Sequence, residues 1–315
     1  MDIEDFKRIA PYLRNVENVV LEGWGESLLH EQLIEFIKLA KQEGPEVGFV
    51  TSGVGLSRKF ISGLIDAGLD FVGFSLSGAT SKTHNSIRIG SDFNELINAI
   101  RLFRKVSIER DVKKPRMHLV YLMLKDNIHE VPLLTDLAKE IGIDEIVLLN
   151  IIHVTNAWQD AQKVFTCNNK EPYQEIMREA ELKAQRSRIR LRKPFLSSHD
   201  VAVCSENPLE NIYVSVDGEV SPCVYLNPPI PSPFKRIFCG VEYDTERVSF
   251  GNMFKESFET IWSRKEFLEF RNRFIFRRRR LEETYASLLD MKRMEEVSLP
   301  EPPSSCRTCH KMLGV

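Results

Sequence analysis

Apolar residues in the first half of the chain follow two alternating patterns. Short apolar runs with the length of buried strands occur at 19–21, 47–50, 71–76, 117–123 and 146–152. Segments with apolar side chains on one helical face occur at 3–15, 29–40, 56–67, 92–105 and 128–141. Buried strands that alternate with amphipathic helices predict a parallel sheet covered by helices.

Glycine and hydroxyl-bearing residues gather where these predicted strands end. They occur at 23–26, 51–53, 75–78 and 150–153. Ligands of α/β proteins bind at the carboxyl ends of the strands. Each segment alone also suits a tight turn, and the dinucleotide fingerprint GxGxxG is absent. Several such segments on one rim favour a ligand site over simple turns.

The regular alternation ends near residue 155. A charged helix is predicted over 170–190, and a proline-rich stretch follows. Asp217-Gly218 between two β-rich runs predicts a hairpin of 212–216 with 219–224. The aromatic residues of 255–276 predict a helix with one packing face. The predicted divisions are a barrel-like domain (1–155), a helical connector (156–199) and a small second domain (200–315).

Composition narrows the class of protein. The 315 residues carry 43 Lys and Arg against 45 Asp and Glu, a net charge of −2 that argues against a whole-surface nucleic-acid binder. No apolar run is long enough for a membrane span, and the first residues do not resemble a secretory signal. We therefore expect a cytoplasmic protein. An arginine run at 277–280, preceded by Arg271 and Arg273, is interpreted as a solvated helix end.

Six cysteines are too few for a disulfide scaffold. Two flank the predicted hairpin and two form a CxxC pair: Cys204, Cys223, Cys306 and Cys309. Four thiolates can surround one zinc ion or one iron–sulfur cluster, and their spacing does not distinguish the two; a frayed terminal CxxC is the alternative. Cys167 and Cys239 have no partner nearby in the sequence and are predicted to be ordinary thiols.

The cysteine spacing resembles a known domain. Thirteen residues separate Cys204 from Gly218, and four separate Gly218 from Cys223, as in the opening of the SPASM domain of radical S-adenosylmethionine (radical SAM) enzymes. Residues 250–262 resemble the glycine-asparagine segment and the helix after it, and 306–309 resemble the closing CxxC. Because the further CxxxxxC and CxxxC ligands are absent, the resemblance implies one auxiliary 4Fe–4S cluster rather than two.

The first half of the chain resembles the radical SAM domain itself. The segment EGWGES (22–27) is similar to the GGEP-type motif, 51–53 to a TNG-like strand end, and 74–88 to the SLDG segment with its trailing His and Arg. The resemblance implies that the first segment holds the amino group of S-adenosylmethionine, which needs a carboxylate partner, and that serines lie near its ribose and carboxylate. The implied cofactor-binding residues are Gly23, Gly25, Glu26, Ser52, Ser75 and Ser77.

One family feature is missing from the sequence. Radical SAM enzymes hold the cluster that cleaves their cofactor in a CxxxCxxC loop after the first strand, and this sequence has no cysteine before Cys167. The resemblance therefore implies a partial (β/α)6-type TIM-like barrel that lacks its first strand and has an exposed edge, plus a small Cys-rich cluster-binding domain. Two explanations remain open. Either a preceding segment supplies the loop and a second 4Fe–4S cluster, or the chain is a catalytically inactive partner-binding protein with a structural four-Cys metal site.

The paired domains also imply an activity, without identifying a catalytic residue. Enzymes with this pairing perform radical-based maturation or modification of a peptide, protein or metal-cofactor enzyme, using S-adenosylmethionine and iron–sulfur clusters. The GWGE form of the rim motif and the long segment around Cys239 resemble the branch associated with tungsten-cofactor oxidoreductases. The implied partners are a peptide or protein substrate, with such an oxidoreductase as one candidate, and an electron donor, but no nucleic acid and no membrane.

Overall fold

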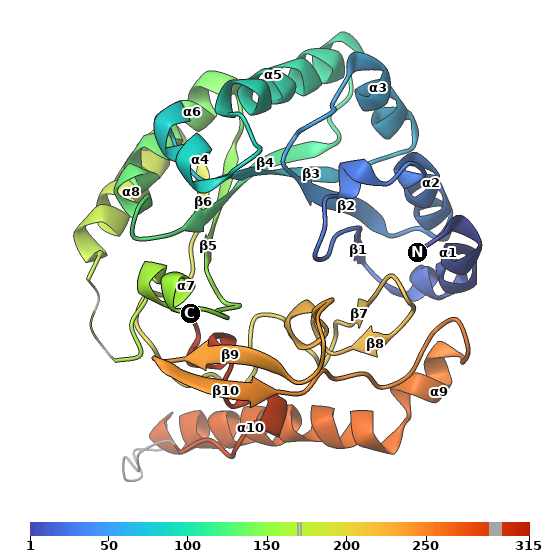
Figure 1. Ribbon diagram of the computed structural model, residues 1–315, viewed down its shortest axis with the longest axis vertical. Coiled ribbons are helices and arrows are strands. Elements are labelled where there is room, and N and C mark those ends of the chain that lie inside the picture. The colour runs from blue at the N-terminus through green and yellow to red at the C-terminus, as the bar shows by residue number, and fades with distance from the viewer. Residues whose placement is uncertain (169, 171, 290–297) are drawn as a thin grey trace.

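The computed structural model describes residues 1–168, 170, 172–289 and 298–315. The first part of the chain forms one sheet whose strands lie in sequence order: β1 (Asn18–Val20), β2 (Glu46–Thr51), β3 (Phe71–Leu76), β4 (Arg116–Met123), β5 (Glu145–Asn150) and β6 (Arg190–Arg192). All neighbouring pairs are parallel. Figure 1 shows the strands as an arc that is open on one side. The predicted α/β fold with a partial barrel is confirmed, and β1 lies at the edge of the sheet as expected.

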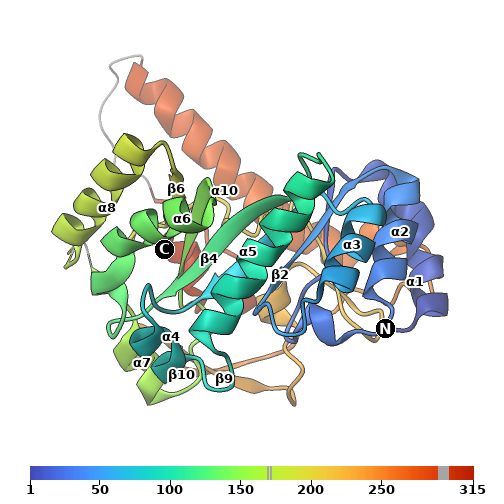
Figure 2. The same ribbon diagram turned by 90° about the horizontal axis from the view of Figure 1, so that it is seen from above.

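A layer of helices covers the outside of the arc (Figures 1 and 2). Its members are α1 (Ile3–Ile9), α2 (Leu33–Glu43), α3 (Arg58–Asp66), α5 (Phe93–Glu109), α6 (Leu134–Ile141) and α8 (Gln174–Ser187). The side chains of Ser57 and Asp92 cap α3 and α5, and Gly44, with φ 109°, ends α2. The core lies between the two layers, where Phe49, Phe74 and other strand residues are fully buried. Two shorter helices, α4 (Ser81–Ile87) and α7 (Ala157–Gln162), follow the carboxyl ends of β3 and β5.

Two local differences from the sequence prediction have clear causes. The helix expected from Leu29 begins at Leu33, because residues 27–29 form a 3-10 turn capped by the carboxylate of Glu26. Strand β6 was not predicted, because its sequence Arg-Leu-Arg carries no apolar run. An ion pair between Arg192 and Glu145 of the neighbouring strand, with an N–O distance of 2.5 Å, supports its position in the sheet.

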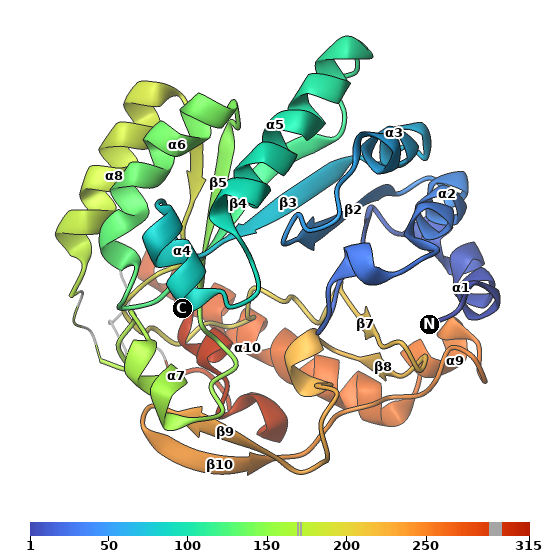
Figure 3. The same cartoon turned by 45° about the horizontal axis from the view of Figure 1, so that its top comes forward.

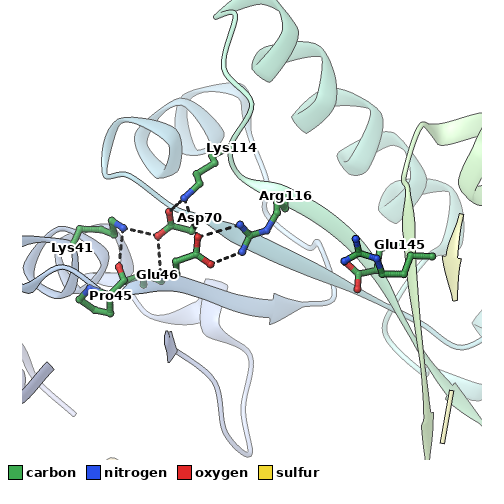
Figure 4. A network of polar contacts seen from close by, with 9 residues as sticks. Lys41, Pro45, Glu46, Asp70, Lys114, Arg116 and Glu145 are labelled. Atoms are coloured by element: carbon green, nitrogen blue, oxygen red, sulfur yellow. Dashed lines mark hydrogen bonds and ion pairs between the residues drawn. The ribbon is translucent and has the colours of Figure 1, made fainter. Parts of the chain in front are cut away.

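The amino ends of the strands carry a network of charged residues (Figure 4). The Asp70 carboxylate accepts hydrogen bonds from Lys114 (2.6 Å), Lys41 (2.7 Å) and the backbone N–H of Val47 (2.8 Å). Nearby, Arg116 forms a two-pronged pair with Glu46 at the start of β2. This edge lies opposite the carboxyl ends of the strands, where ligands bind, so the network is assigned to stability.

The second part of the chain lies across the opening of the arc (Figures 1 and 3). Its elements are β7 (Tyr213–Val214), β8 (Val220–Ser221), β9 (Phe234–Phe238), β10 (Val241–Thr245), α9 (Phe258–Trp262) and α10 (Lys265–Leu289). The predicted hairpin is confirmed as the antiparallel pair of β7 and β8. The aromatic stripe is also confirmed as a packing face, although the helix is interrupted at 263–264: Phe250 stacks on Phe267 with ring centroids 4.2 Å apart.

A second hairpin, formed by β9 and β10, lies in a region for which no strand was predicted. Prolines precede it, and Cys239 and Gly240 form its two-residue turn with φ values of 50° and 83°. Positive φ is uncommon for a residue other than glycine, so a Cys-Gly pair predicts such a turn less strongly than Asn-Gly or Asp-Gly does. The hairpin was therefore missed. Figure 2 shows this hairpin with α4 and α7 at one end of the barrel.

The prediction that Cys167 and Cys239 are ordinary thiols is wrong. They form a disulfide between the segment after α7 and the turn of the second hairpin. The two residues lie 72 positions apart, and the contact depends on a hairpin that the sequence did not reveal.

The interpretation of the arginine run as a solvated helix end is wrong for two of its members. Arg277 is 1% exposed and donates to the carbonyls of Val201, Ala202 and Pro300. Arg271 lies 3.6 Å over the ring of Trp262. The other arginines of the run are exposed. Within the described ranges, no helix has both the length and the hydropathy that crossing a bilayer requires.

Candidate cofactor and cluster sites

Glu26 is the centre of a polar rim at the carboxyl ends of β1 and β2. Its carboxylate accepts hydrogen bonds from the hydroxyl of Thr51 (2.7 Å), the N–H of Ser52 (2.7 Å) and the N–H of Leu28 (3.2 Å). Burial tends to raise the pKa of Glu26, but the hydrogen bonds from Ser52 and Thr51 outweigh it, so its pKa lies below the ordinary value. The rim therefore holds a charged carboxylate at neutral pH.

A guanidinium accompanies this carboxylate. Arg88, just beyond α4, is partly buried, which lowers its pKa, while the charge of Glu26 acts to raise it. Arg88 and Glu26 are thus close enough to interact electrostatically. A carboxylate and a guanidinium on one rim match the ammonium and carboxylate of an amino-acid moiety.

The other predicted rim residues have different surroundings. Ser52 lines an open hollow of about 470 Å³ beside the start of α5. A side chain at Gly23 would come within 3.2 Å of the Tyr213 hydroxyl, so this glycine allows close approach of the second domain, whereas Gly25 has open space around it. The structure thus brings Glu26 and Ser52 into direct contact.

Ser75 and Ser77 lie further along the rim, at the end of β3. Ser75 is partly buried, and Ser77 is 4% exposed. The backbone N–H of Ser77 donates to Nδ1 of His84 (3.2 Å), and its carbonyl accepts from Asn127 (3.0 Å). These contacts fix the turn, and among the described residues no hydrogen bond connects either serine with Glu26.

Sequence reasoning missed several residues that build the rim. Thr51 belongs to the predicted strand-end segment 51–53 but was not among the predicted cofactor-binding residues, although its hydroxyl holds Glu26. Glu130 is 5% exposed and accepts from the N–H groups of Ala79 and Thr80, so it fixes the loop after β3. Thr51 could have been identified by its place beside Ser52. Glu130 carries no local signal, because it is 50 residues from the loop it holds.

The four predicted metal ligands lie in a second site, against one apolar cluster of the second domain. Cys306 is 7% exposed, and the other three, Cys204, Cys223 and Cys309, are partly buried against the same apolar cluster. All four are free thiols. The structure thus gathers cysteines from both sides of the first hairpin and from the CxxC segment.

The four thiols are close enough to affect one another's ionisation. Burial raises the pKa of the Cys204 thiol to about 11, with a further contribution from Cys309. Burial and then the charges of Cys309, Glu206 and Cys204 raise the pKa of Cys223, and burial and then the charges of Cys309, Cys223 and Cys204 raise the pKa of Cys306. Thiols that oppose one another's ionisation in this way become stable thiolates when a cation lies between them. The donor set therefore fits a metal centre.

The spacing of the thiols bears on which centre fits. A tetrahedral zinc site with Zn–S bonds of about 2.3 Å places its sulfurs about 3.8 Å apart. In the described part of the chain, three or more potential ligand atoms lie within 4.8 Å of one another only at Cys167, Cys239 and His310. No three of the four free thiols meet this limit, so the described side chains do not form a ready-made tetrahedral zinc set.

Trp24 connects the rim with the cysteine site. Its indole N–H donates to the carbonyl of Val224 (3.2 Å), the residue after Cys223. Its ring also lies edge-on to His153 and Tyr225, with centroid distances of 4.8 and 6.5 Å. The motif that carries Glu26 therefore contacts the loop that carries a predicted ligand.

Glu22 lies next to this connection. Burial, and then the charge of Glu206 in the second domain, raises its pKa above the ordinary value. The carboxyl group of Glu22 thus gains a proton more readily than an ordinary glutamate.

Comparisons with known proteins match two separate parts of the chain. Residues 1–152 match the model of the radical SAM superfamily, and residues 204–310 match that of an iron–sulfur cluster-binding domain, SPASM. A tungsten-containing aldehyde ferredoxin oxidoreductase cofactor-modifying protein from Pyrococcus furiosus is 22% identical over 277 residues, covering 86% of this chain and 75% of that one. A probable GTP 3',8-cyclase from Saccharolobus islandicus is 26% identical over 234 residues, covering 70% and 72%.

Solved structures show the same fold. The SuiB protein of Streptococcus suis bound to S-adenosylmethionine superimposes with a TM-score of 0.60 at 13% identity, covering 83% of this chain and 58% of SuiB. The anSMEcpe protein with bound AdoMet gives a TM-score of 0.60 at 15% identity, covering 85% and 73%. This chain thus spans less than two thirds of SuiB.

Proposed function

Because this chain belongs to the radical SAM superfamily and carries a SPASM domain, we propose that it binds one auxiliary 4Fe–4S cluster and S-adenosylmethionine, and that it serves in radical-based maturation of a peptide, protein or metal-cofactor enzyme. The observation that carries the proposal is the group of four free thiols, one buried and three partly buried, next to a rim with a charged carboxylate.

The four cysteines would hold the cluster. Their mutual effect on pKa supports a cationic centre between them, and the match of residues 204–310 to an iron–sulfur cluster-binding domain supports a cluster rather than a zinc ion. An auxiliary cluster at this place supplies a site for electron transfer or substrate ligation. Trp24 would fix the position of the loop that carries Cys223 relative to the rim, because its indole N–H donates a hydrogen bond to the carbonyl of Val224.

The rim would hold S-adenosylmethionine. Glu26 is oriented by Thr51 and Ser52, so its carboxylate is charged and positioned to receive an ammonium group. Arg88 would bind the carboxylate end of the same ligand. The printed sequence offers no cysteine ligands for the cluster that cleaves S-adenosylmethionine in this family, and we assign no step to that cluster.

The proposed substrate class rests on one of the curated relatives. The relative from Pyrococcus furiosus is named as a cofactor-modifying protein for a tungsten-containing oxidoreductase. We propose a partner of that kind for this chain, together with an electron donor for the cluster. In the organism that encodes the chain, deletion of its gene should then lower the activity of a tungsten-cofactor oxidoreductase, and re-expression should restore it.

Anaerobic reconstitution with iron and sulfide tests the cluster. We expect about four irons per chain and broad visible absorbance. Cys223→Ser and Cys309→Ser should each lower the iron content, whereas Cys167→Ser, outside the four-thiol group, should retain it. One zinc per chain with no iron–sulfur absorbance would contradict the cluster and support a structural metal site in a partner-binding protein.

Calorimetric titration of the reconstituted protein with S-adenosylmethionine tests the rim. Glu26→Gln removes the charge that pairs with the ammonium and should weaken binding by about tenfold or more, the effect of losing one charge-assisted hydrogen bond. Glu31→Gln changes an exposed glutamate nearby and provides the matched control. Equal affinity of the two variants would place the cofactor elsewhere.

A further inference from the structure

A second group of potential metal ligands lies apart from the four free thiols. It joins three segments: Cys167 follows α7, Cys239 is in the turn of the β9–β10 hairpin, and His310 follows Cys309. The two sulfurs and a ring nitrogen of the histidine lie within 4.8 Å of one another. Two sulfurs and one imidazole nitrogen form a recognised zinc-binding set.

His310 is a buried histidine whose two ring nitrogens both face backbone groups. The side chain is fully buried and lies between the rings of Phe165 and Phe238, at centroid distances of 4.9 and 5.1 Å. Its Nδ1 faces the carbonyl of Ile152 at 3.5 Å, and its Nε2 lies 3.4 Å from the N–H of Cys239. A carbonyl behind one ring nitrogen is the usual way to direct the other nitrogen at a metal.

The disulfide alone does not explain this arrangement. A disulfide needs no third ligand, yet a ring nitrogen of a buried histidine lies within 4.8 Å of both sulfurs, and the Nε2 of that histidine accepts a hydrogen bond of 3.4 Å from the N–H of Cys239. The charged residues around His310 are Lys163 and Arg236, with Asp160 as the acidic one. Nearby cations stabilise thiolates, which are the form of cysteine that binds metal.

We propose that Cys167, Cys239 and His310 form a metal site for one thiophilic divalent ion, zinc being the best match, and that reduction of the disulfide opens it. A dithiol reductant supplies two electrons and two protons, breaks the S–S bond and leaves as its own disulfide. Zinc then binds the two thiolates and Nε2, and the two thiol protons pass to solvent.

The geometry allows this exchange. Cys167 is exposed and lies in a loop, so its side chain can turn to the roughly 3.8 Å sulfur separation of a tetrahedral site. The same exposure leaves a fourth position open to water. Because His310 directly follows Cys309, metal binding here would also fix the segment that carries a predicted cluster ligand.

Zinc titration of the full chain, reconstituted with iron and then reduced with a thiol-free phosphine, tests the site. Competition with a chromophoric chelator measures the zinc, and iron is measured before and after. We expect one tightly bound zinc per chain with unchanged iron. Cys167→Ser should remove it, whereas Asn168→Ala, a change of the exposed neighbour, should not.

A second variant tests the role of the histidine. His310→Gln should retain zinc but weaken its binding by at least the 10- to 100-fold that loss of a supporting contact to a metal site costs. Equal zinc stoichiometry in the parent and Cys167→Ser, or the same affinity in His310→Gln, would overturn the site. Absence of tight zinc from the reduced parent would leave the disulfide as a covalent link only and would also overturn it. The iron content reports on the four-thiol cluster separately.

Discussion

The Asp70 network at the amino ends of the strands makes the sharpest prediction about stability. Asp70→Asn keeps the shape of the side chain but removes its charge. The side chain is 3% exposed and receives hydrogen bonds from two lysines. Such charge-assisted bonds contribute about 1.5–3 kcal/mol each, but the side chains of Lys41 and Lys114 are 27% and 50% exposed and regain water. We therefore expect the free energy of unfolding to fall by about 2–3 kcal/mol.

The pH dependence of this difference has a fixed sign. Burial tends to raise the pKa of Asp70, but hydrogen bonds from Lys114, Lys41 and Val47 outweigh it and hold the pKa below its ordinary value. A carboxylate with a lowered folded-state pKa stabilises the protein above its unfolded pKa, and this stabilisation is lost as pH falls through the folded pKa. The difference between parent and variant should be constant from about pH 5 to 8 and shrink below about pH 4.

Urea unfolding followed by circular dichroism measures both effects. Asp66→Asn is the matched control, because Asp66 also pairs with an arginine but its side chain is 63% exposed. The midpoint of urea unfolding of Asp66→Asn should equal that of the parent within error. A parent-like midpoint for Asp70→Asn, or a difference that grows as pH falls, would refute the reasoning.

Three further predictions concern the second domain and its contact with the rim. Arg277→Ala removes a buried guanidinium that binds three backbone carbonyls, so it should lower the free energy of unfolding by about 3 kcal/mol. Arg278→Ala changes an exposed arginine and should leave the free energy of unfolding unchanged; the midpoints of urea unfolding measure both effects. Gly218→Ala places a Cβ 2.7 Å from an aromatic ring at φ 81° and should lower iron loading, whereas Gly240→Ala, at φ 83° with open space, should not. Trp24→Phe removes a hydrogen bond to the cluster loop and should speed amide exchange at 220–227 by about fivefold, measured by mass spectrometry.

Much of the barrel was predictable because its strands and helices have strong periodic patterns. The runs at 47–50 and 71–76 lie within β2 and β3, since both strands are buried on two faces. Strand β6 was not predictable, since its neighbour in the sheet, rather than its own sequence, makes it a strand.

The residues of the two sites could be predicted from the sequence only in part. The four cysteines and Glu26 could be singled out because each belongs to a motif with a chemical meaning. Contacts between distant segments could not. The disulfide of Cys167 with Cys239 and the burial of Arg277 both depend on tertiary packing, and local sequence carries no record of it.

The separation of the cysteines along the chain has a consequence for the life of the protein in a cell. Cys204 and Cys306 lie roughly one hundred residues apart, so a shared metal centre would close most of the second domain into one loop. Loss of that centre to an oxidant or to iron shortage would loosen the loop and expose its backbone to proteases. The rate at which the polypeptide is degraded would then depend on the supply of iron. Molecules without a cluster would be degraded before they could bind the substrate.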